Sequence, residues 1–197
     1  MDKRIVPALA AFLLAAPAAA ETIESAYTDL DIKRDCSMFD ESDEGDGAAS
    51  FACNGYLGYP VLIYSGDLRD SLFFGFPPGE APKWESFDGF NAAGPKIEWR
   101  VLVNGEKRIP FATIHRWSVS TDPEDPDVKT EVLVVEKVGQ VDHREGCAVG
   151  YVVATGNAKA NETARKIADE QVRGFTCGAD EPVQVEGSVG VPPFSRE

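Results

Sequence analysis

The chain has 197 residues, of which 33 are acidic and 19 basic, so its formal net charge is −14 at pH 7. This charge argues against nucleic acid as a partner, because a protein that neutralises phosphates needs a basic face. The same charge keeps a protein soluble, and it also attracts basic proteins, polyamines or divalent cations. Composition alone leaves both interpretations open.

Residues 1–20 are typical of a secretory signal peptide. Three charged residues at 2–4 precede an apolar run, and the segment ends in Pro17 and three alanines. The apolar stretch falls short of the roughly 20 residues that a membrane-spanning helix needs. We expect cleavage before Glu21, a periplasmic or extracellular protein without a membrane span, and a mature charge of −14 − (+1) = −15. Residues 21–180 are predicted to form one domain, followed by a flexible tail at 181–197.

The first half of the mature chain predicts short strands. In residues 22–34, Leu30 and Ile32 alternate with aspartates as on a half-buried strand. An acidic turn follows at 40–47, then strands at 50–53, 61–64 and 71–76. The segment 77–95 is rich in glycine and proline, so we expect a long surface loop with one helical turn near Trp84.

The second half carries stronger local signals. The strand predicted at 97–103 runs into Asn104-Gly105, whose positive φ angles suit a hairpin turn. Its returning strand is predicted at 111–119, with Pro110 at a bulge or an edge. Two more strands are expected at 131–136 and 147–154, separated from the hairpin by an acidic loop at 122–127.

Residues 158–172 change to a helical period. Five apolar residues share one face of that helix, and Asn157 and Gly174 suit its N-cap and its C-terminal stop. Only one long helical segment appears among strands joined by hairpins. The predicted fold is therefore α+β, a largely antiparallel sheet of about six to eight strands with one C-terminal helix packed on it.

Four cysteines in an exported chain predict two disulfides. No C-x-x-C spacing indicates zinc or redox chemistry. Cys36 and Cys53 flank a hairpin-like excursion, and an antiparallel return of the helix along the last strand brings Cys177 near Cys147. We therefore expect the pairs 36–53 and 147–177.

No catalytic, cofactor-binding or metal-binding residue is assigned from the sequence. The common hydrolase, zinc-protease and nucleotide-binding motifs are missing. His115 is a candidate base only if a nucleophile faces it, and His143 reads as a solvated loop residue. The acidic turns at 40–47 and 122–127 offer oxygen ligands for Ca²⁺ but lack EF-hand spacing, so we interpret them as solvated loops and leave Ca²⁺ binding open.

Three aromatic residues lie in the loop that is rich in glycine and proline, where a sheet does not automatically bury them. They are Trp84, Phe87 and Phe90. Either the loop folds onto the sheet as a lid, or it presents an aromatic interaction surface.

Several segments resemble a group of exported alphaproteobacterial proteins of unknown function. They are residues 27–31, Cys36, residues 53–56, 66–69, 110–114 and 164–170. The resemblance extends over most of the mature chain and implies a bacterial exported protein, without supplying an activity or a ligand. The small, acidic, disulfide-bonded β domain is also similar in style to lysozyme inhibitors, although no inhibitor motif matches.

These observations favour a non-catalytic binding or interaction protein of an inhibitor-like kind, whose partner is a basic protein or a cell-envelope component. The alternative is a hydrolase-like enzyme with a dispersed site that involves His115. A pocket that brings His115 together with a serine or carboxylate favours the enzyme. A solvent-facing aromatic patch without such a cluster favours binding.

Overall fold

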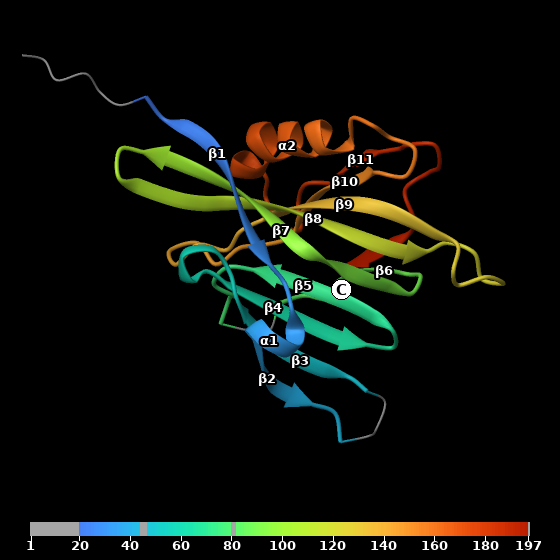
Figure 1. The fold of residues 1–197 in the computed structure, drawn as a ribbon. Coiled ribbons are helices and arrows are strands. Elements are labelled where there is room, and N and C mark those ends of the chain that lie inside the picture. The colour runs from blue at the N-terminus through green and yellow to red at the C-terminus, as the bar shows by residue number, and fades with distance from the viewer. Residues whose placement is uncertain (1–19, 44–46, 80–81, 197) are drawn as a thin grey trace, which may run out of the picture.

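A six-stranded sheet forms the centre of the molecule, with a helix on one face and a second sheet on the other (Figure 1). The structure, a computed structural model, describes residues 20–43, 47–79 and 82–196. Most of the predicted signal peptide and part of the acidic turn at 40–47 lie outside the described residues. Within them the protein is mostly antiparallel β-sheet, so the α+β class fits only loosely.

The central sheet has the strand order β1-β7-β8-β9-β10-β11. Its strands are β1 (Thr22–Asp29), β7 (Asn91–Asn104), β8 (Lys107–Ser120), β9 (Lys129–Lys137), β10 (Ala148–Val153) and β11 (Val183–Val185). Every pair is antiparallel except β10 with β11. The long hairpin β7–β8 forms where it was predicted, but Asn104 pairs with Lys107, so its two turn residues are Gly105 and Glu106. Of Asn104, Gly105 and Glu106, only Gly105 has a positive φ, +60°, so the prediction of positive φ at both Asn104 and Gly105 is corrected. The register shifts beside Pro110, where the bulge was expected.

The second sheet has the order β2-β3-β4-β5 and is antiparallel throughout. Its strands are β2 (Cys36–Glu41), β3 (Ala49–Asn54), β4 (Pro60–Gly66) and β5 (Arg69–Phe74). A short 3₁₀ turn, Tyr56–Gly58, joins β3 to β4. Strand β2 is an edge, and the hairpin β2–β3 projects away from the central sheet (Figure 1).

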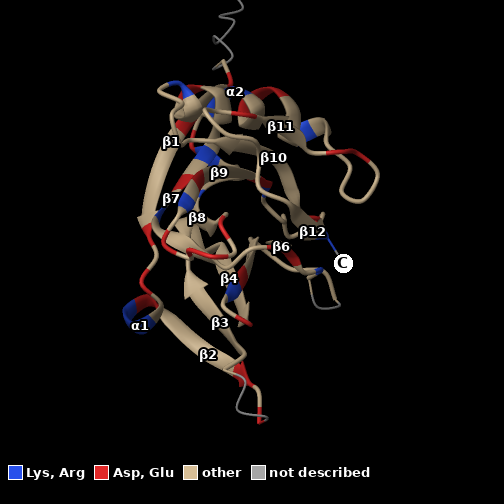
Figure 2. Ribbon diagram, turned by 90° about the vertical axis from the view of Figure 1, so that its right-hand side faces the viewer, with Lys and Arg blue, Asp and Glu red and all other residues tan. Residues whose placement is uncertain are grey.

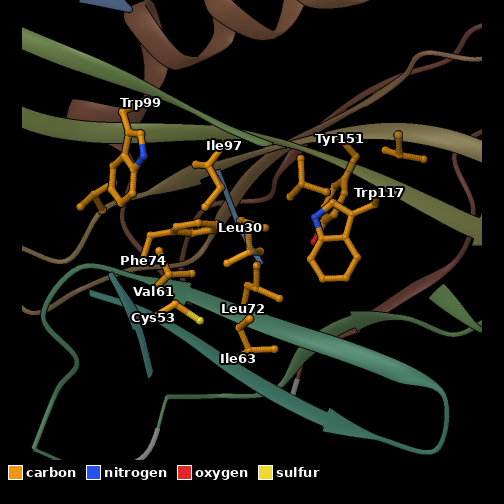
Figure 3. Close-up of a cluster of buried hydrophobic side chains, with 14 of the residues drawn as sticks. Leu30, Cys53, Val61, Ile63, Leu72, Phe74, Ile97, Trp99, Trp117 and Tyr151 are labelled. Carbon is orange, nitrogen blue, oxygen red and sulfur yellow. The ribbon is translucent and has the colours of Figure 1, made fainter. Parts of the chain in front are cut away.

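The two sheets enclose the main core (Figure 3). Period-two alternation puts Ile97 and Trp99 on the face of β7 that meets the second sheet, which contributes Ile63 and Phe74. Phe74 meets Trp99 edge to face with ring centroids 5.8 Å apart. Burying side chains of this size contributes about 2–3 kcal/mol each, so this layer holds the sheets together.

Helix α2 (Ala160–Gln171) covers the opposite face of the central sheet and continues into a 3₁₀ turn, Val172–Gly174. Its buried face is the predicted one: Ala160, Ala164, Ile167, Ala168 and then Val172. The N-cap prediction is corrected. The cap position is Lys159, and the Asn157 side chain instead accepts from the backbone N of Lys159 at 3.0 Å.

Both predicted disulfides are present, Cys36–Cys53 and Cys147–Cys177. The first joins paired residues of β2 and β3. The second ties the start of β10 to the segment after α2.

Other local predictions differ from the structure. Residues 32–35 form the short helix α1 (Ile32–Asp35) instead of extending the first strand, because the Asp31 side chain accepts from the backbone N atoms of Lys33 and Arg34. The expected helical turn near Trp84 is replaced by strand β6 (Glu85–Phe87). The tail contributes β11 and also β12 (Phe194–Arg196), which pairs with β6. The described residues contain twelve strands in sheets of six, four and two, whereas a single sheet of about six to eight strands was predicted.

Candidate functional site

A groove of about 420 Å³ lies where several turns meet at one end of the two sheets. We call it the end groove. It is lined by Gly47, Ser65–Asp70, Phe90–Ala92, Ser118, Ser120 and Lys129. The β4–β5 turn forms its wall, and the backbone N of Asn91 donates to Leu68 O at 3.1 Å, which holds that turn against the β6–β7 connection.

Two large apolar side chains of the end groove face solvent. Leu68 is 72% exposed and Phe90 is 47% exposed. Leu68 also has φ +57°, and the preceding Asp67 has φ +52°. Hairpin turns with two such residues favour asparagine and glycine, because a leucine in the left-handed region costs roughly 1–2 kcal/mol. The fold therefore tolerates a strained, solvent-facing leucine at this position.

Acidic segments border the end groove on two sides. The loop between β8 and β9 carries four carboxylates at 122–127, and its flanking residues Ser120 and Lys129 line the groove. The end of β2 carries Asp40 and Glu41, close to the connection that contributes Gly47. Figure 2 shows the acidic end of β2 in red at the lower end of the molecule. The wall itself is balanced, since Asp67 pairs with Arg69 at 3.3 Å.

The three aromatic residues, for which a lid and an interaction surface were the two alternatives, do not form one patch. Phe87 is only 2% exposed and packs in the core against Trp117 and Tyr151. Trp84 is partly buried, and Phe90 alone is open to solvent at the end groove. Phe87 therefore acts as a core residue, and Leu68, which the sequence did not single out, stands beside Phe90.

His115 lies inside the core and not in a pocket. It is fully buried between Phe74 and Trp117, and its Nε2 is 2.6 Å from Gly94 O. Burial lowers the pKa of His115 to about 4, although the contact with Gly94 opposes the shift. No serine or carboxylate of the described residues meets its Nδ1, which has no hydrogen-bond partner. This geometry does not favour the hydrolase interpretation.

A second, wider depression of about 1140 Å³ lies at the other end of β9, and we call it the cleft. Glu85 and Glu136 line its base, and Lys83 and Arg144 line its sides. Glu85 accepts from Arg196 Nε at 2.7 Å and from the backbone N of Ala148 at 2.7 Å.

Glu136 differs from Glu85 because it has no hydrogen-bond partner among the described residues and is only 6% exposed. Burial, together with the nearby charge of Glu85, raises the pKa of Glu136 well above its usual value of 4.5. A glutamate of this kind is protonated where an ordinary surface glutamate is ionised. The cleft is therefore a candidate ligand site, with a neutral carboxyl at its base.

A charged network joins α2 to the central sheet. Arg100 binds Asp169 through two hydrogen bonds of 2.8 and 2.6 Å, and Arg165 binds Glu98 at 2.7 and 3.0 Å. Burial raises the pKa of Glu98, but hydrogen bonds from Arg165 and Ser25 outweigh it and leave that pKa lowered. Since every member is partnered, we interpret this network as structural.

Among the described residues, no group of three or more histidine, cysteine, aspartate and glutamate side chains is arranged to hold a metal ion. His143 stands in a solvent-exposed connection, whereas Asp40 and Glu41 of the predicted acidic turn are exposed residues at the end of β2. In the part of the chain that the structure describes, no helix has the length and apolar character to cross a membrane.

Comparison with known proteins gives no family for the chain. No protein-family model, no curated protein and no solved structure matches it. The functional argument therefore depends on the residues and their geometry alone.

Proposed function

We propose that the protein is an exported, non-catalytic binding protein that recognises a basic protein partner at the end groove. The observation that carries this proposal is that a strained, exposed leucine, Leu68, lines the end groove together with the exposed Phe90. A leucine in the left-handed region lowers stability, and its side chain gains little burial within the fold in return. Residues whose backbone strain is not offset by packing within the fold are concentrated at functional sites.

The surroundings of Leu68 support the same conclusion. Phe90 provides a second exposed apolar contact in the same groove, and binding energy concentrates on such anchors. The acidic loop at 122–127 and the acidic end of β2 would draw a positively charged surface toward these anchors and speed its association.

Export is the second part of the proposal. Residues 1–20 have the pattern of a signal peptide, and the two disulfides suit an oxidising compartment. A periplasmic or extracellular location would place the end groove in contact with basic proteins or other components of the cell envelope.

The experiment compares capture by two asparagine variants. Leu68→Asn removes the apolar side chain and relaxes the turn, because asparagine adopts positive φ readily. Leu57→Asn is the matched control: Leu57 is also exposed (60%) and has φ +51°, but it lies before β4, at the opposite end of that strand from Leu68. Both variants are expected to be at least as stable as the parent.

Each immobilised protein is exposed to a cell-envelope extract, and the retained proteins are identified. We expect a basic protein that binds the parent and Leu57→Asn but is lost with Leu68→Asn and with Phe90→Ser. Its association is expected to slow as salt rises from about 0.05 to 0.5 M, because the Debye length shrinks from roughly 14 to 4 Å. Equal retention by Leu68→Asn and the parent, or association that ignores salt, would contradict the proposal.

A further inference from the structure

A small cavity adjoins the base of the cleft, between β6, β8, β9 and β10. Its volume is about 20 Å³, and it shares Glu85 and Glu136 with the cleft. Trp117, Tyr151 and Ser86 complete its polar lining. This site is separate from the end groove, which has none of these residues in its lining.

Three of these polar groups have no hydrogen-bond partner among the described residues. The indole Nε1 of Trp117 is buried and unpartnered. The hydroxyl of Tyr151 and the carboxyl of Glu136 belong to side chains that are at least nine-tenths buried, and no described residue bonds to them. Figure 3 shows the Trp117 nitrogen and the Tyr151 oxygen directed toward the same region.

The other two polar groups are already satisfied. Ser86 Oγ donates to Asp70 O at 2.7 Å and accepts from Asn91 Nδ2 at 3.1 Å. Glu85 is held by Arg196 and by the backbone N of Ala148. The unmet hydrogen-bonding capacity of the cavity therefore belongs to Trp117, Tyr151 and Glu136. Buried polar groups without any partner cost about 1–3 kcal/mol each, so such a cluster indicates a ligand.

We propose that this cavity is a binding site for one water molecule, held by Trp117 Nε1, the Tyr151 hydroxyl and the Glu136 carboxyl. The volume fits one water, since a polar cavity needs roughly 10–15 Å³ of this kind to accept one, and buried waters typically make about three hydrogen bonds. An organic ligand is too large. A metal cation does not suit the site, because the Trp117 N–H is a donor that a cation cannot satisfy.

The bonding pattern follows from the chemistry of the three groups. The water oxygen accepts from the Trp117 N–H, since an indole is only a donor, and the water donates to an oxygen of Glu136 or of Tyr151. Because Glu136 lines both the cavity and the cleft, the water connects the buried polar groups of Trp117 and Tyr151 to the carboxyl at the base of the cleft. The site thereby completes the hydrogen bonds of a carboxyl that the protein alone leaves unpaired.

A crystal structure of the parent protein tests the site directly. We expect a water peak at 2.7–3.2 Å from at least two of the three groups, at a resolution that shows other buried waters. Absence of that peak would overturn the proposal. So would a direct hydrogen bond from Trp117 or Tyr151 to Glu136 that closes the cavity.

Two substitutions at Glu136 separate hydrogen bonding from shape. Glu136→Gln keeps a polar group of similar size, and we expect it to retain the water. Glu136→Leu removes one of three partners and places an apolar group against the cavity, and we expect the peak to be lost. A peak of equal strength in Glu136→Leu would show that Glu136 does not hold the water. If that variant does not fold, the parent and Glu136→Gln structures still decide the proposal.

Discussion

Replacing Glu136 by glutamine is expected to change how stability depends on pH. The folded-state pKa of Glu136 lies well above its usual value of 4.5, because the carboxyl is buried near Glu85. Above about pH 4.5 the unfolded chain releases this proton while the folded protein keeps it. The stabilisation is therefore complete below pH 4.5 and is lost as pH rises through the folded-state pKa, at about 1.4 kcal/mol per pH unit.

His115 changes the free energy of unfolding in the opposite direction over part of the same pH range. Burial lowers its pKa from 6.5 to about 4, so between these values the unfolded chain binds a proton that the folded protein does not. Stability then rises with pH by about 1.4 kcal/mol per unit. Between about pH 4.5 and 6.5 the contributions of Glu136 and His115 oppose each other. The pH dependence of the parent's free energy of unfolding therefore does not reveal either contribution by itself.

Urea unfolding of the parent, Glu136→Gln and His115→Gln at pH 5.0, 5.5 and 6.0 separates these contributions. The free energy of unfolding of Glu136→Gln minus that of the parent is expected to increase by about 1.4 kcal/mol between pH 5 and 6. His115→Gln is expected to show the reverse trend. A difference between Glu136→Gln and the parent that stays constant over this pH unit would refute the assignment of a protonated Glu136.

Three further predictions concern stability and are measured by denaturant unfolding. Asp169→Ala leaves the buried Arg100 without its bidentate partner and is expected to cost about 3 kcal/mol, whereas replacing both residues by apolar ones is expected to recover most of that loss. Removing the Cys147–Cys177 disulfide with two alanines is expected to cost on the order of 3 kcal/mol, because it frees a loop with a sequence separation of 30. Gly75→Ala is expected to cost more than 2 kcal/mol, since Gly75 has φ +91° and a Cβ would lie 2.2 Å from a backbone oxygen. Gly79→Ala is the control and is expected to be nearly neutral, because Gly79 has open space around it and no positive φ.

The elements that were predictable have local causes. The β7–β8 hairpin follows from a local glycine signal, because Gly105 adopts the positive φ that its tight turn needs, although the two turn residues, Gly105 and Glu106, lie one position later than predicted. The apolar face of α2 follows from a period that one segment contains completely. The disulfides follow from the same reasoning, because each pair lies at the ends of adjacent elements.

The elements that were missed depend on distant partners. Strand β6 has three residues, and its pairing partner β12 lies more than 100 residues later, with Phe87 opposite Phe194. A segment rich in glycine and proline gives no local sign of such pairing, so the sequence predicted a loop at Phe87. It is buried because the C-terminal strand lies beside it and Tyr151 packs against its ring.

The candidate sites were only partly readable. Phe90 was identified because an aromatic residue stood in a loop, but Leu68 occupies a turn where the sequence has neither asparagine nor glycine, so its positive φ carried no signal. The sequence did carry a signal for Glu136. It continues the alternation of Val132 and Val134, whose side chains face the core, and a carboxylate at the next position of that series indicates a buried acid.

Glu98 and Glu136 show how the two faces of one sheet treat the same side chain. Both are buried glutamates, on β7 and β9 respectively, yet their pKa values shift in opposite directions. Glu98 faces α2, where Arg165 reaches it from the helix and satisfies both oxygens. Glu136 faces the second sheet, where the charge of Glu85 adds to burial in raising its pKa.

This difference explains why only one of the two carboxyls indicates a site. A buried charge with its full set of partners holds α2 in place and offers nothing to a ligand. A buried acid without partners needs a group that the chain does not supply, and a hydrogen-bonding molecule of the size of its cavity meets that need. The contrast between the two glutamates therefore separates the structural polar network from the candidate binding chemistry of this protein.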